Sequence, residues 1–283
     1  MLLSALISAL NGATTKILAD DLNALEIVFF RNLLGVALVL YALRVRPPKL
    51  TGGKFHLLFL RGMLGFMAMI LFFYTITTIP LGEAITLNKT SPLFVSILAF
   101  FLLNERVNVK IIFAIFIGFF GVILIAKPFG MSISYEHMLG VLGGFFAASA
   151  YATIKKIKDI YDSRVIMLSF VSTGAIIPGI LFLITPYISS ATSLEFLFEP
   201  FIFPTSIKIW LLIIFMAIIS TLSQWLLTKA YSLGNASIIG VISYTNIPFA
   251  IGFGYMLGDA FPDILTFCGI GLIVLSGILV SKK

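Results

Sequence analysis

Two basic side chains lie deep inside apolar stretches of this chain. Arg31 and Lys89 each stand about seven residues inside a predicted helix, roughly 10 Å below the outer boundary of a membrane. A charge within a bilayer costs from about 2.5 to more than 10 kcal/mol, so it usually turns towards protein or water. Because no carboxylate lies equally deep in the sequence, we predict that both residues hold an anionic group of a small substrate. The alternatives are that they snorkel to the surface or are capped by free carbonyl groups.

Uncharged polar residues extend this predicted site along the same helix. Thr86 and Lys89 share one face at a spacing of three residues, with Asn88 beside them. Pro92 follows in the middle of the helix, and because proline has no amide hydrogen, it should free the carbonyl of Asn88. A kink that serves packing alone is the alternative reading. We predict that Pro92 is a hinge and that Thr86 and Asn88 contact the substrate.

A second proline stands in a matching polar segment near the end of the chain. Pro248 should similarly free the carbonyl of Tyr244, and Asn246 lies between them. A buried amide needs hydrogen-bond partners, which makes Asn246 a strong candidate. Gln224, in another apolar stretch, could face the same cavity. The predicted substrate-binding residues are therefore Arg31, Thr86, Asn88, Lys89, Gln224, Tyr244 and Asn246, and the predicted hinges are Pro92 and Pro248.

The sequence has no arrangement of residues that is typical of catalysis or cofactor binding. The two histidines, His56 and His137, fall at predicted connections, and Cys268 is the only cysteine. No pair of histidine or cysteine residues has the spacing of metal ligands, and no glycine-rich phosphate-binding loop is present. We therefore expect no enzyme activity, no metal or cofactor, and no nucleic-acid partner. A membrane-embedded enzyme acting on lipids is a rival, and it lacks a visible pair of nucleophile and base.

Composition indicates a membrane protein. Of 283 residues, 60% are hydrophobic and 11% are charged, with a mean hydropathy of +1.11. A soluble domain averages about 25% charged residues, so a water-soluble fold is excluded. Apolar runs twice as long as barrel strands favour helices over a membrane β-barrel. We predict ten spanning helices at 1–18, 25–43, 58–79, 82–103, 109–127, 138–156, 164–186, 207–229, 234–257 and 262–281.

The first of these segments is short and polar, with Asn11, Thr14, Thr15 and Lys16. It has no charged leading region or cleavage site, so we interpret it as a spanning helix and not as a signal peptide. Either other parts of the protein surround this segment, or the true start of the chain lies upstream of Met1.

Lys and Arg residues at the segment ends predict the orientation. Fourteen lie on the side of the N-terminus, Arg61 among them, and three lie on the other side. Both termini should therefore face the cytoplasm, in the cell inner membrane. Glu26 and Glu83 fall near outer helix ends, where we expect them to be hydrated. With no acidic residue or histidine expected in the deep core, uniport or exchange is favoured over proton symport.

The two halves of the sequence resemble each other. A tyrosine, a proline, an acidic residue and a glycine recur in the same order at offsets of 154–157 residues, from Tyr74, Pro92, Glu105 and Gly121 to Tyr231, Pro248, Asp259 and Gly277. Since five helices are an odd number, the two halves would be inverted in the membrane. Secondary transporters commonly have such repeats, with the binding site between them. The alternative is that apolar helices simply look alike.

Several short motifs resemble the EamA type of the drug/metabolite transporter superfamily. They are Leu25–Asn32, Pro80–Ala84, Thr90–Phe94, Leu103–Arg106 and Gly118–Val122. Two residues depart from the pattern: Lys89 replaces an apolar or small residue, and Asp259 replaces a glutamate in the second half. The resemblance implies ten helices in two inverted halves, 1–130 and 131–283. It also implies alternating access for small metabolites and a cavity lined by the second, fourth, seventh and ninth helices, with the eighth as a further candidate.

We therefore predict an all-α secondary transporter of a small polar or amphipathic metabolite, such as an amino-acid-like, anionic or zwitterionic compound. Its partners would be this small molecule and the lipid bilayer, and the protein would be a monomer or a weak homodimer. A channel-like facilitator with the same polar stripe along a continuous pore is the main alternative.

Overall fold

The computed structural model describes residues 1–48, 52–91, 93–95, 97–98, 109–126, 134–187, 196–233, 239 and 242–281. These residues are predominantly helical, with no extended strand among them, so the all-α prediction is confirmed. Ten α-helices have described bounds, and a 3-10 turn, Thr185–Tyr187, follows the seventh of them. The helices are α1 (Leu2–Leu18), α2 (Ala24–Val45), α3 (Phe55–Thr78), α4 (Leu81–Asn88), α6 (Val109–Ala126), α7 (Tyr135–Ile157), α8 (Ser163–Ile184), α9 (Ile207–Leu233), α11 (Asn246–Met256) and α12 (Ile264–Ser281).

The described helices suit a lipid environment. Five of them, α2, α3, α7, α8 with its 3-10 turn, and α9, are long and apolar enough to cross a membrane, and α1 and parts of α6 and α12 are shorter apolar helices. Large apolar side chains point outwards, for example Phe116, Leu183 and Ile264, which are 71%, 73% and 83% exposed. Since an aqueous surface would not expose so many large apolar groups, these side chains face lipid.

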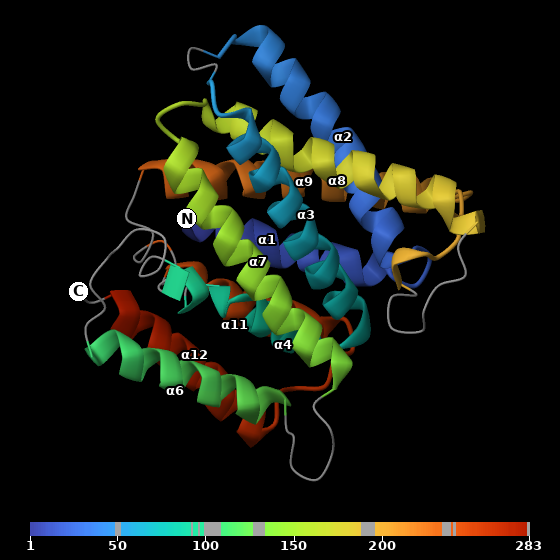
Figure 1. Ribbon diagram of the computed structural model, residues 1–283. Helices are drawn as coiled ribbons and strands as arrows, with labels where there is room; N and C mark the ends of the chain where they lie inside the picture. Colours follow the sequence, from blue (N-terminus) through green and yellow to red (C-terminus); the bar gives the residue numbers. More distant parts are fainter. Residues whose placement is uncertain are drawn as a thin grey trace.

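The helices pack in matching pairs (Figure 1). Helix α3 packs against α7 and α8, while α9 packs against α1 and α2. Helix α2 packs against α8, α4 against α11, and α6 against α12. If the described helices are divided into two sets of five in order, exchanging the sets turns the α3–α7 contact into α9–α1 and the α3–α8 contact into α9–α2, and it turns the other three contacts into themselves. The beginning of α1 and the end of α12 lie on the same side of the view in Figure 1.

Helices α6 and α12 form a separate layer at one edge of the bundle (Figure 1). Their backbones approach closely at two glycines. A Cβ atom at Gly121 would lie 2.7 Å from the carbonyl oxygen of Gly269, and one at Gly269 would lie 2.6 Å from that of Gly121. Small residues at such a crossing allow the close packing that holds helices together in lipid.

Two helices that the sequence predicted as continuous are interrupted near their middle. Helix α4 ends at Asn88, a turn follows at Lys89 and Thr90, and helical structure resumes at Ser91. Helix α11 begins at Asn246, directly after a turn at Tyr244 and Thr245. The predicted segments 82–103 and 234–257 are therefore discontinuous, with breaks at corresponding places in the two halves. The two broken helices pack against each other.

A glycine of α7 accommodates the first of these breaks. A Cβ atom at Gly144 would lie 2.4 Å from Oγ1 of Thr90 and 3.2 Å from the carbonyl oxygens of Leu87 and Asn88. A Cβ atom at Gly140, one turn away along α7, would likewise lie close to the Leu87 side chain. These small residues let α7 pack directly onto the turn that carries Lys89.

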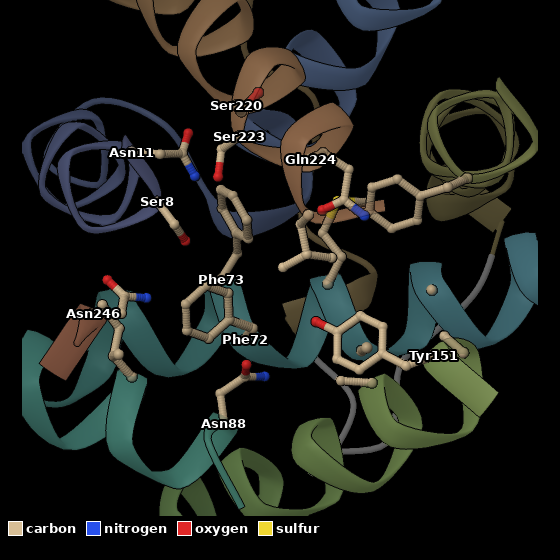
Figure 2. A pocket seen from close by; sticks show the side chains of 18 of the residues that line it. Ser8, Asn11, Phe72, Phe73, Asn88, Tyr151, Ser220, Ser223, Gln224 and Asn246 are labelled. Carbon is tan, nitrogen blue, oxygen red and sulfur yellow. The ribbon is translucent and has the colours of Figure 1, made fainter. Parts of the chain in front are cut away.

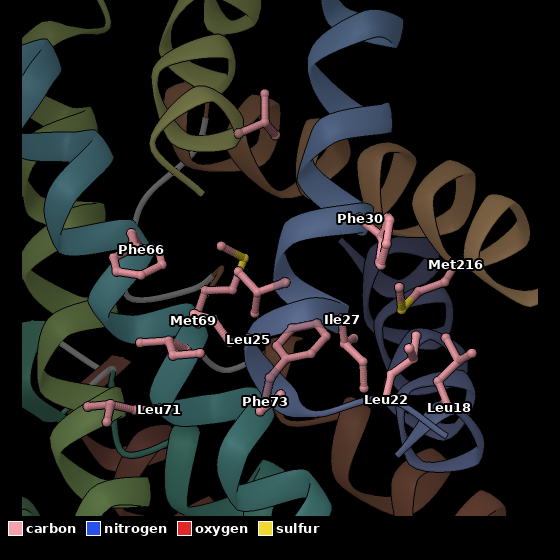
Figure 3. Close-up of a cluster of buried hydrophobic side chains, with 14 of the residues drawn as sticks. Leu18, Leu22, Leu25, Ile27, Phe30, Phe66, Met69, Leu71, Phe73 and Met216 are labelled. Carbon is pink, nitrogen blue, oxygen red and sulfur yellow. The ribbon is translucent and has the colours of Figure 1, made fainter. Parts of the chain in front are cut away.

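The largest apolar core joins α1, α2, α3, α8 and α9 (Figure 3). Leu18, Leu25 and Ile27 are fully buried in it, as Met216 of α9 is. Helix α2 begins with a reciprocal cap, in which the Asn23 side chain accepts from the Glu26 amide at 2.8 Å and Glu26 accepts from the Asn23 amide at 3.0 Å. This core fixes the position of α2 and α3, which carry the two arginines described below.

Candidate substrate-binding cavity

A cavity of about 100 Å³ lies between the interrupted helices and α1, α2, α3, α7, α8 and α9. It has room for a few water molecules and is smaller than the roughly 300–1,000 Å³ of pockets that hold drug-sized ligands. Entry of a metabolite therefore requires the helices to move apart. The polar side chains that line it are those of Ser8, Asn11, Arg31, Arg61, Asn88, Lys89, Tyr151, Ser220, Ser223, Gln224 and Asn246.

Two arginines and an aromatic ring form one part of this lining. The guanidinium carbons of Arg31 and Arg61 lie 5.9 and 4.9 Å from the centre of the same Phe170 ring, and Arg31 also lies 5.3 Å from the centre of Phe73. Arg31 is 7% exposed and Arg61 is 1% exposed. Nη1 of Arg31 contacts the sulfur of Met69. The arginine end of the cavity, defined as Arg31, Arg61 and Phe170, thus combines buried charge with aromatic surface.

The charge of this cavity is not balanced within the described residues. Lys89 joins the two arginines in the lining, and no aspartate or glutamate is among the described residues that line it. The Nε atom of Arg31 and the Nε and Nη1 atoms of Arg61 are buried with no hydrogen-bond partner in the described structure. A desolvated cation–π contact contributes about 2 kcal/mol, less than the several kcal/mol that burial of a charge costs. The aromatic rings therefore offset only part of the cost, and an anion would offset the rest.

Two amide groups without hydrogen-bond partners lie on one side of the cavity. Figure 2 shows Asn11, Ser8 and Asn246 on one side of the cavity, with Gln224 and Tyr151 on the other. Asn11 and Asn246 are 6% and 1% exposed, and their Oδ1 atoms have no hydrogen-bond partner in the described structure. Since a buried amide is normally hydrogen-bonded, these groups are free to bind a ligand that donates hydrogen bonds.

Five of the predicted site residues meet in this cavity, namely Arg31, Asn88, Lys89, Gln224 and Asn246. Two do not. The Thr86 hydroxyl donates to the carbonyl of Gly82 at 2.6 Å and is fully buried. Tyr244 lies away from the cavity, where its ring occupies the space that a Cβ atom at Gly277 would need. Thr86 and Tyr244 are therefore not among the described residues that line this cavity, and their contact with a substrate stays a prediction.

The predicted release of a carbonyl group by Pro248 needs a separate correction. Pro248 is the third residue of α11, in the first turn, where a helix has no partner for the amide that proline lacks. The carbonyl of Tyr244 is not free, because it accepts from the Ile247 amide at 2.9 Å. The break at 244–245 thus comes before the proline and is not produced by a mid-helix kink. Pro92, and with it the predicted release of the Asn88 carbonyl, lies outside the described residues.

Sequence reasoning missed Arg61 as a cavity residue. The predicted segment began at residue 58, which placed Arg61 at a helix end among the orientation signals. The helix begins at Phe55, so Arg61 stands seven residues inside it and is fully buried. The signal was available, because Arg61 is followed by 17 helical residues without another charge. Asn11 and the arginine-contacting Phe170 were also missed.

An acidic residue closes one end of the bundle. Asp259 forms an ion pair with Lys16 at the end of α1, and its Oδ2 atom accepts from the Leu81 amide at the start of α4 at 3.0 Å. The turn that presents it has Gly258 at a φ of +95°, with the Asp259 amide donating to the Gly254 carbonyl at 2.9 Å. A Cβ atom at Gly254 would lie 2.7 Å from Oδ2 of Asp259. We call Lys16, Leu81 and Asp259 the end latch.

Two aromatic rings lie on the other side of the cavity. Tyr151 of α7 and Tyr231 of α9 are stacked, with ring centres 4.6 Å apart and planes at 14°. Tyr151 also lines the cavity, and both tyrosines lie in the C-terminal parts of their helices. The contacts of the end latch and the stacked tyrosine pair are consistent with a closed cavity of small volume.

Glu26 differs from its expected environment. It is fully buried, caps α2 and accepts from the Ile202 amide, so the expectation that it is hydrated is wrong. The hydrogen bond between Glu26 and Ile202 connects the start of α2 to the segment before α9. Glu83 is partly buried, with Oε2 3.4 Å from Nε2 of His137 and Oε1 3.5 Å from the Thr266 hydroxyl. Neither carboxylate lines the cavity.

A larger hollow of about 500 Å³ lies beside α6 and α7. Apart from Tyr135 and His137, the residues that line it are apolar, among them Phe94, Ile123 and Phe145. Such a surface accommodates lipid chains and offers little to a polar solute. The smaller cavity, with its cations and amides, is therefore the candidate substrate site.

Comparison with known proteins shows similarity over nearly the whole chain. The profile of the EamA-like transporter family matches residues 1–127 and 134–282. An uncharacterized transporter of Helicobacter pylori is 32% identical over 99% of this chain and 93% of its own length. The pseudopaline exporter of Pseudomonas aeruginosa is 29% identical over 96% and 90%, and an S-adenosylmethionine uptake transporter of Rickettsia prowazekii is 26% identical over 96% and 88%. A solved crystal structure shares the fold with a TM-score of 0.65 at 18% identity, covering 98% of this chain and 94% of the other.

Proposed function

The chain belongs to the EamA-like transporter family and is a secondary transporter of small metabolites, and we propose that its substrates are anionic or zwitterionic compounds carried by alternating access. It is not an enzyme, since the named relatives are transporters. The observation that carries the proposal is the cavity with three cationic side chains and, among the described residues, no carboxylate in its lining. Lys89 and Arg31 hold a carboxylate or phosphate of the substrate.

The unpartnered amides explain why zwitterions belong to the proposed class. Asn11 and Asn246 offer hydrogen-bond acceptors on the side of the cavity away from Gln224 and Tyr151 (Figure 2). An ammonium or hydroxyl group on the substrate would donate to them while its anionic group contacts Arg31 and Lys89. Asn88 and Gln224 supply further polar contacts in the same cavity.

The two halves of the chain, 1–130 and 131–283, act as inverted repeats in this proposal. The matching helix contacts and the two helix breaks support this division, as does the odd number of helices predicted in each half. Asn88 and Lys89 at one break and Asn246 at the other bring both repeats to the cavity. Rocking of one repeat against the other would open it to each side in turn.

Charge distribution supports a location in the cell inner membrane, with both termini in the cytoplasm. Arg61 belongs to the cavity and leaves the count of orientation signals, yet a strong excess of Lys and Arg remains on the side of the N-terminus. In this orientation the end latch faces outwards. We propose that the protein is a monomer or a weak homodimer.

The test is thermal stabilisation of the purified protein by compounds that share a carbon skeleton and differ in charge. Glutarate, the neutral glutaramide and the dication cadaverine form one set, and sets of four to eight carbons cover differences in length. A compound present at ten times its Kd stabilises by about 1.4 kcal/mol, or a few degrees in Tm. We expect stabilisation by the carboxylates alone. Stabilisation by the diamines or the neutral amides, with none by the carboxylates, would refute the proposal.

A further inference from the structure

The arginine end of the cavity contains more positive charge than a single anionic group requires. Arg31 and Lys89 suffice for one carboxylate, and Arg61 adds a third cation from a different helix, α3. The charge of Arg61 is not needed for topology, because the residue is 1% exposed and seven residues inside its helix. It is not paired with a described acidic group either, since the residue contacts the Phe170 ring and its Nε and Nη1 atoms have no hydrogen-bond partner in the described structure.

The backbone beside Arg61 is shaped to receive its guanidinium. A Cβ atom at Gly65, one turn along α3, would lie 2.2 Å from Nη1 of Arg61 and 2.5 Å from the Phe170 ring. Any side chain at position 65 would therefore displace one or both groups. Gly65 also lines the cavity, so the space it leaves open is where the guanidinium meets the site.

Phe170 connects the two arginines. Both guanidinium carbons lie within 6 Å of the centre of its ring, and no aspartate or glutamate is among the described residues that line the cavity. Two like charges held against one ring repel each other, and an anionic group bound at each of them would reduce that repulsion. Guanidinium groups bind carboxylates and phosphates with two parallel hydrogen bonds, which requires the free donors found here.

We propose that Arg61 forms a second anion subsite, and that the substrates of this transporter carry at least two anionic groups, as dicarboxylates or larger polycarboxylates do. One group binds Lys89 and Arg31, and the other binds Arg61. Gly65 is a positioning residue that allows the Arg61 guanidinium to reach the cavity. This inference rests on the proposed function, because it assigns a finer substrate class to the same cavity.

The experiment compares two probes that differ by one charge. Glutarate carries two carboxylates, whereas glutaramate carries one carboxylate and one amide of nearly the same shape. Their Kd values are measured on the full chain in lipid nanodiscs at pH 7.5, where every carboxylate is ionised, and the succinate and adipate pairs control for length. We expect the wild-type protein to bind the dianion at least tenfold more tightly than the monoanion.

Three variants then test whether the preference for the dianion depends on Arg61. Arg61→Gln should reduce the preference to about twofold or less while the Kd of glutaramate stays within twofold of wild type. Arg61→Lys, which keeps the charge, should retain most of the preference. Gly65→Ala should reduce it, because a Cβ atom at this position would displace the Arg61 guanidinium or the Phe170 ring. A general packing defect would weaken both probes equally, so the ratio of the two Kd values separates a binding role from a structural one.

The outcomes distinguish this inference from the proposed function. Equal binding of both probes by the wild-type protein, or an unchanged preference in Arg61→Gln, would overturn the second subsite and leave the anion proposal intact. A failure of every carboxylate in all length sets to bind would overturn both. If Arg61→Gln does not fold, Arg61→Lys and Gly65→Ala decide the question by the same ratio.

Discussion

At the scale of residues, the buried cations are kept at a cost to stability. Arg31 is 7% exposed, and its Nε atom has no hydrogen-bond partner in the described structure. The stability of the empty protein would therefore be higher without this charge, while its affinity for anions would be lower. Such opposition between stability and function is typical of binding sites.

We predict that Arg31→Gln raises the Tm of the protein without substrate by about 2–5 °C, because an unpaired buried charge is removed. The same change should lower the affinity for carboxylates at least tenfold. Scanning calorimetry or fluorimetry with and without glutarate measures both effects. Lys156→Gln, which removes an exposed cation outside the cavity, is the matched control and should change neither. A lower Tm combined with unchanged affinity would show that Arg31 has a structural role.

The candidate site was predictable where a residue type conflicts with its surroundings. Arg31 and Lys89 are costly in lipid and therefore indicate a cavity, and an amide such as Asn246 needs partners wherever it is buried. Arg61 obeys the same rule, and it was missed because a predicted helix start three residues late moved it to a helix end. Phe170 could not be predicted, because one phenylalanine among 28 has no local signal.

At the scale of elements, the helix breaks position the site. The turn at Lys89 and Thr90 brings Lys89 to the cavity, and Gly144 of α7 makes room for this turn. The sequence located both breaks near prolines, but their position depends on backbone hydrogen bonds and, for the break at Lys89, on contacts with α7. Those contacts come from tertiary packing, which local patterns do not contain.

We predict that Gly144→Val destabilises the protein by about 1–3 kcal/mol, because its side chain would overlap Thr90 and the backbone of Leu87 and Asn88. Substrate affinity should fall as well, since the turn that carries Lys89 must shift. Gly252→Ala in α11 is the control, because no atom lies within 4 Å of a Cβ atom there. Chemical or thermal unfolding in nanodiscs measures the difference. Equal stability of the two variants would contradict the role of Gly144.

At the scale of the whole molecule, the end latch holds the structure closed on the side predicted to face outwards. Asp259 joins α1, α4 and the end of α11 through Lys16 and Leu81. Helices α4 and α11 come from different halves of the chain, so the latch must open for those halves to separate at that end. The all-α fold could be predicted from composition and segment length. The contacts of the end latch could not, because they join segments that are far apart in the sequence and meet only through tertiary packing.

We predict that Asp259→Asn shifts the protein towards the state open at the latch, since it removes the ionic partner of Lys16. The native Cys268 is replaced by serine, and Ser8 in the cavity is replaced by cysteine as a reporter. The Ser8→Cys thiol should then react about five to ten times faster with a membrane-impermeant reagent added from the latch side. Slower or unchanged labelling relative to the same reporter with Asp259 intact would show that the latch does not control access.

Counterflow in proteoliposomes is the most direct test that this cationic cavity is the transport site. Vesicles are loaded with the carboxylate that stabilises the protein most, and uptake of the labelled compound is measured for wild type, Lys156→Gln and Lys89→Ala. We predict several-fold stimulation by internal substrate in the first two and at least a tenfold higher KM, or no uptake, in Lys89→Ala. Unchanged KM and stimulation in Lys89→Ala, or wild-type uptake that is indifferent to internal substrate, would contradict it.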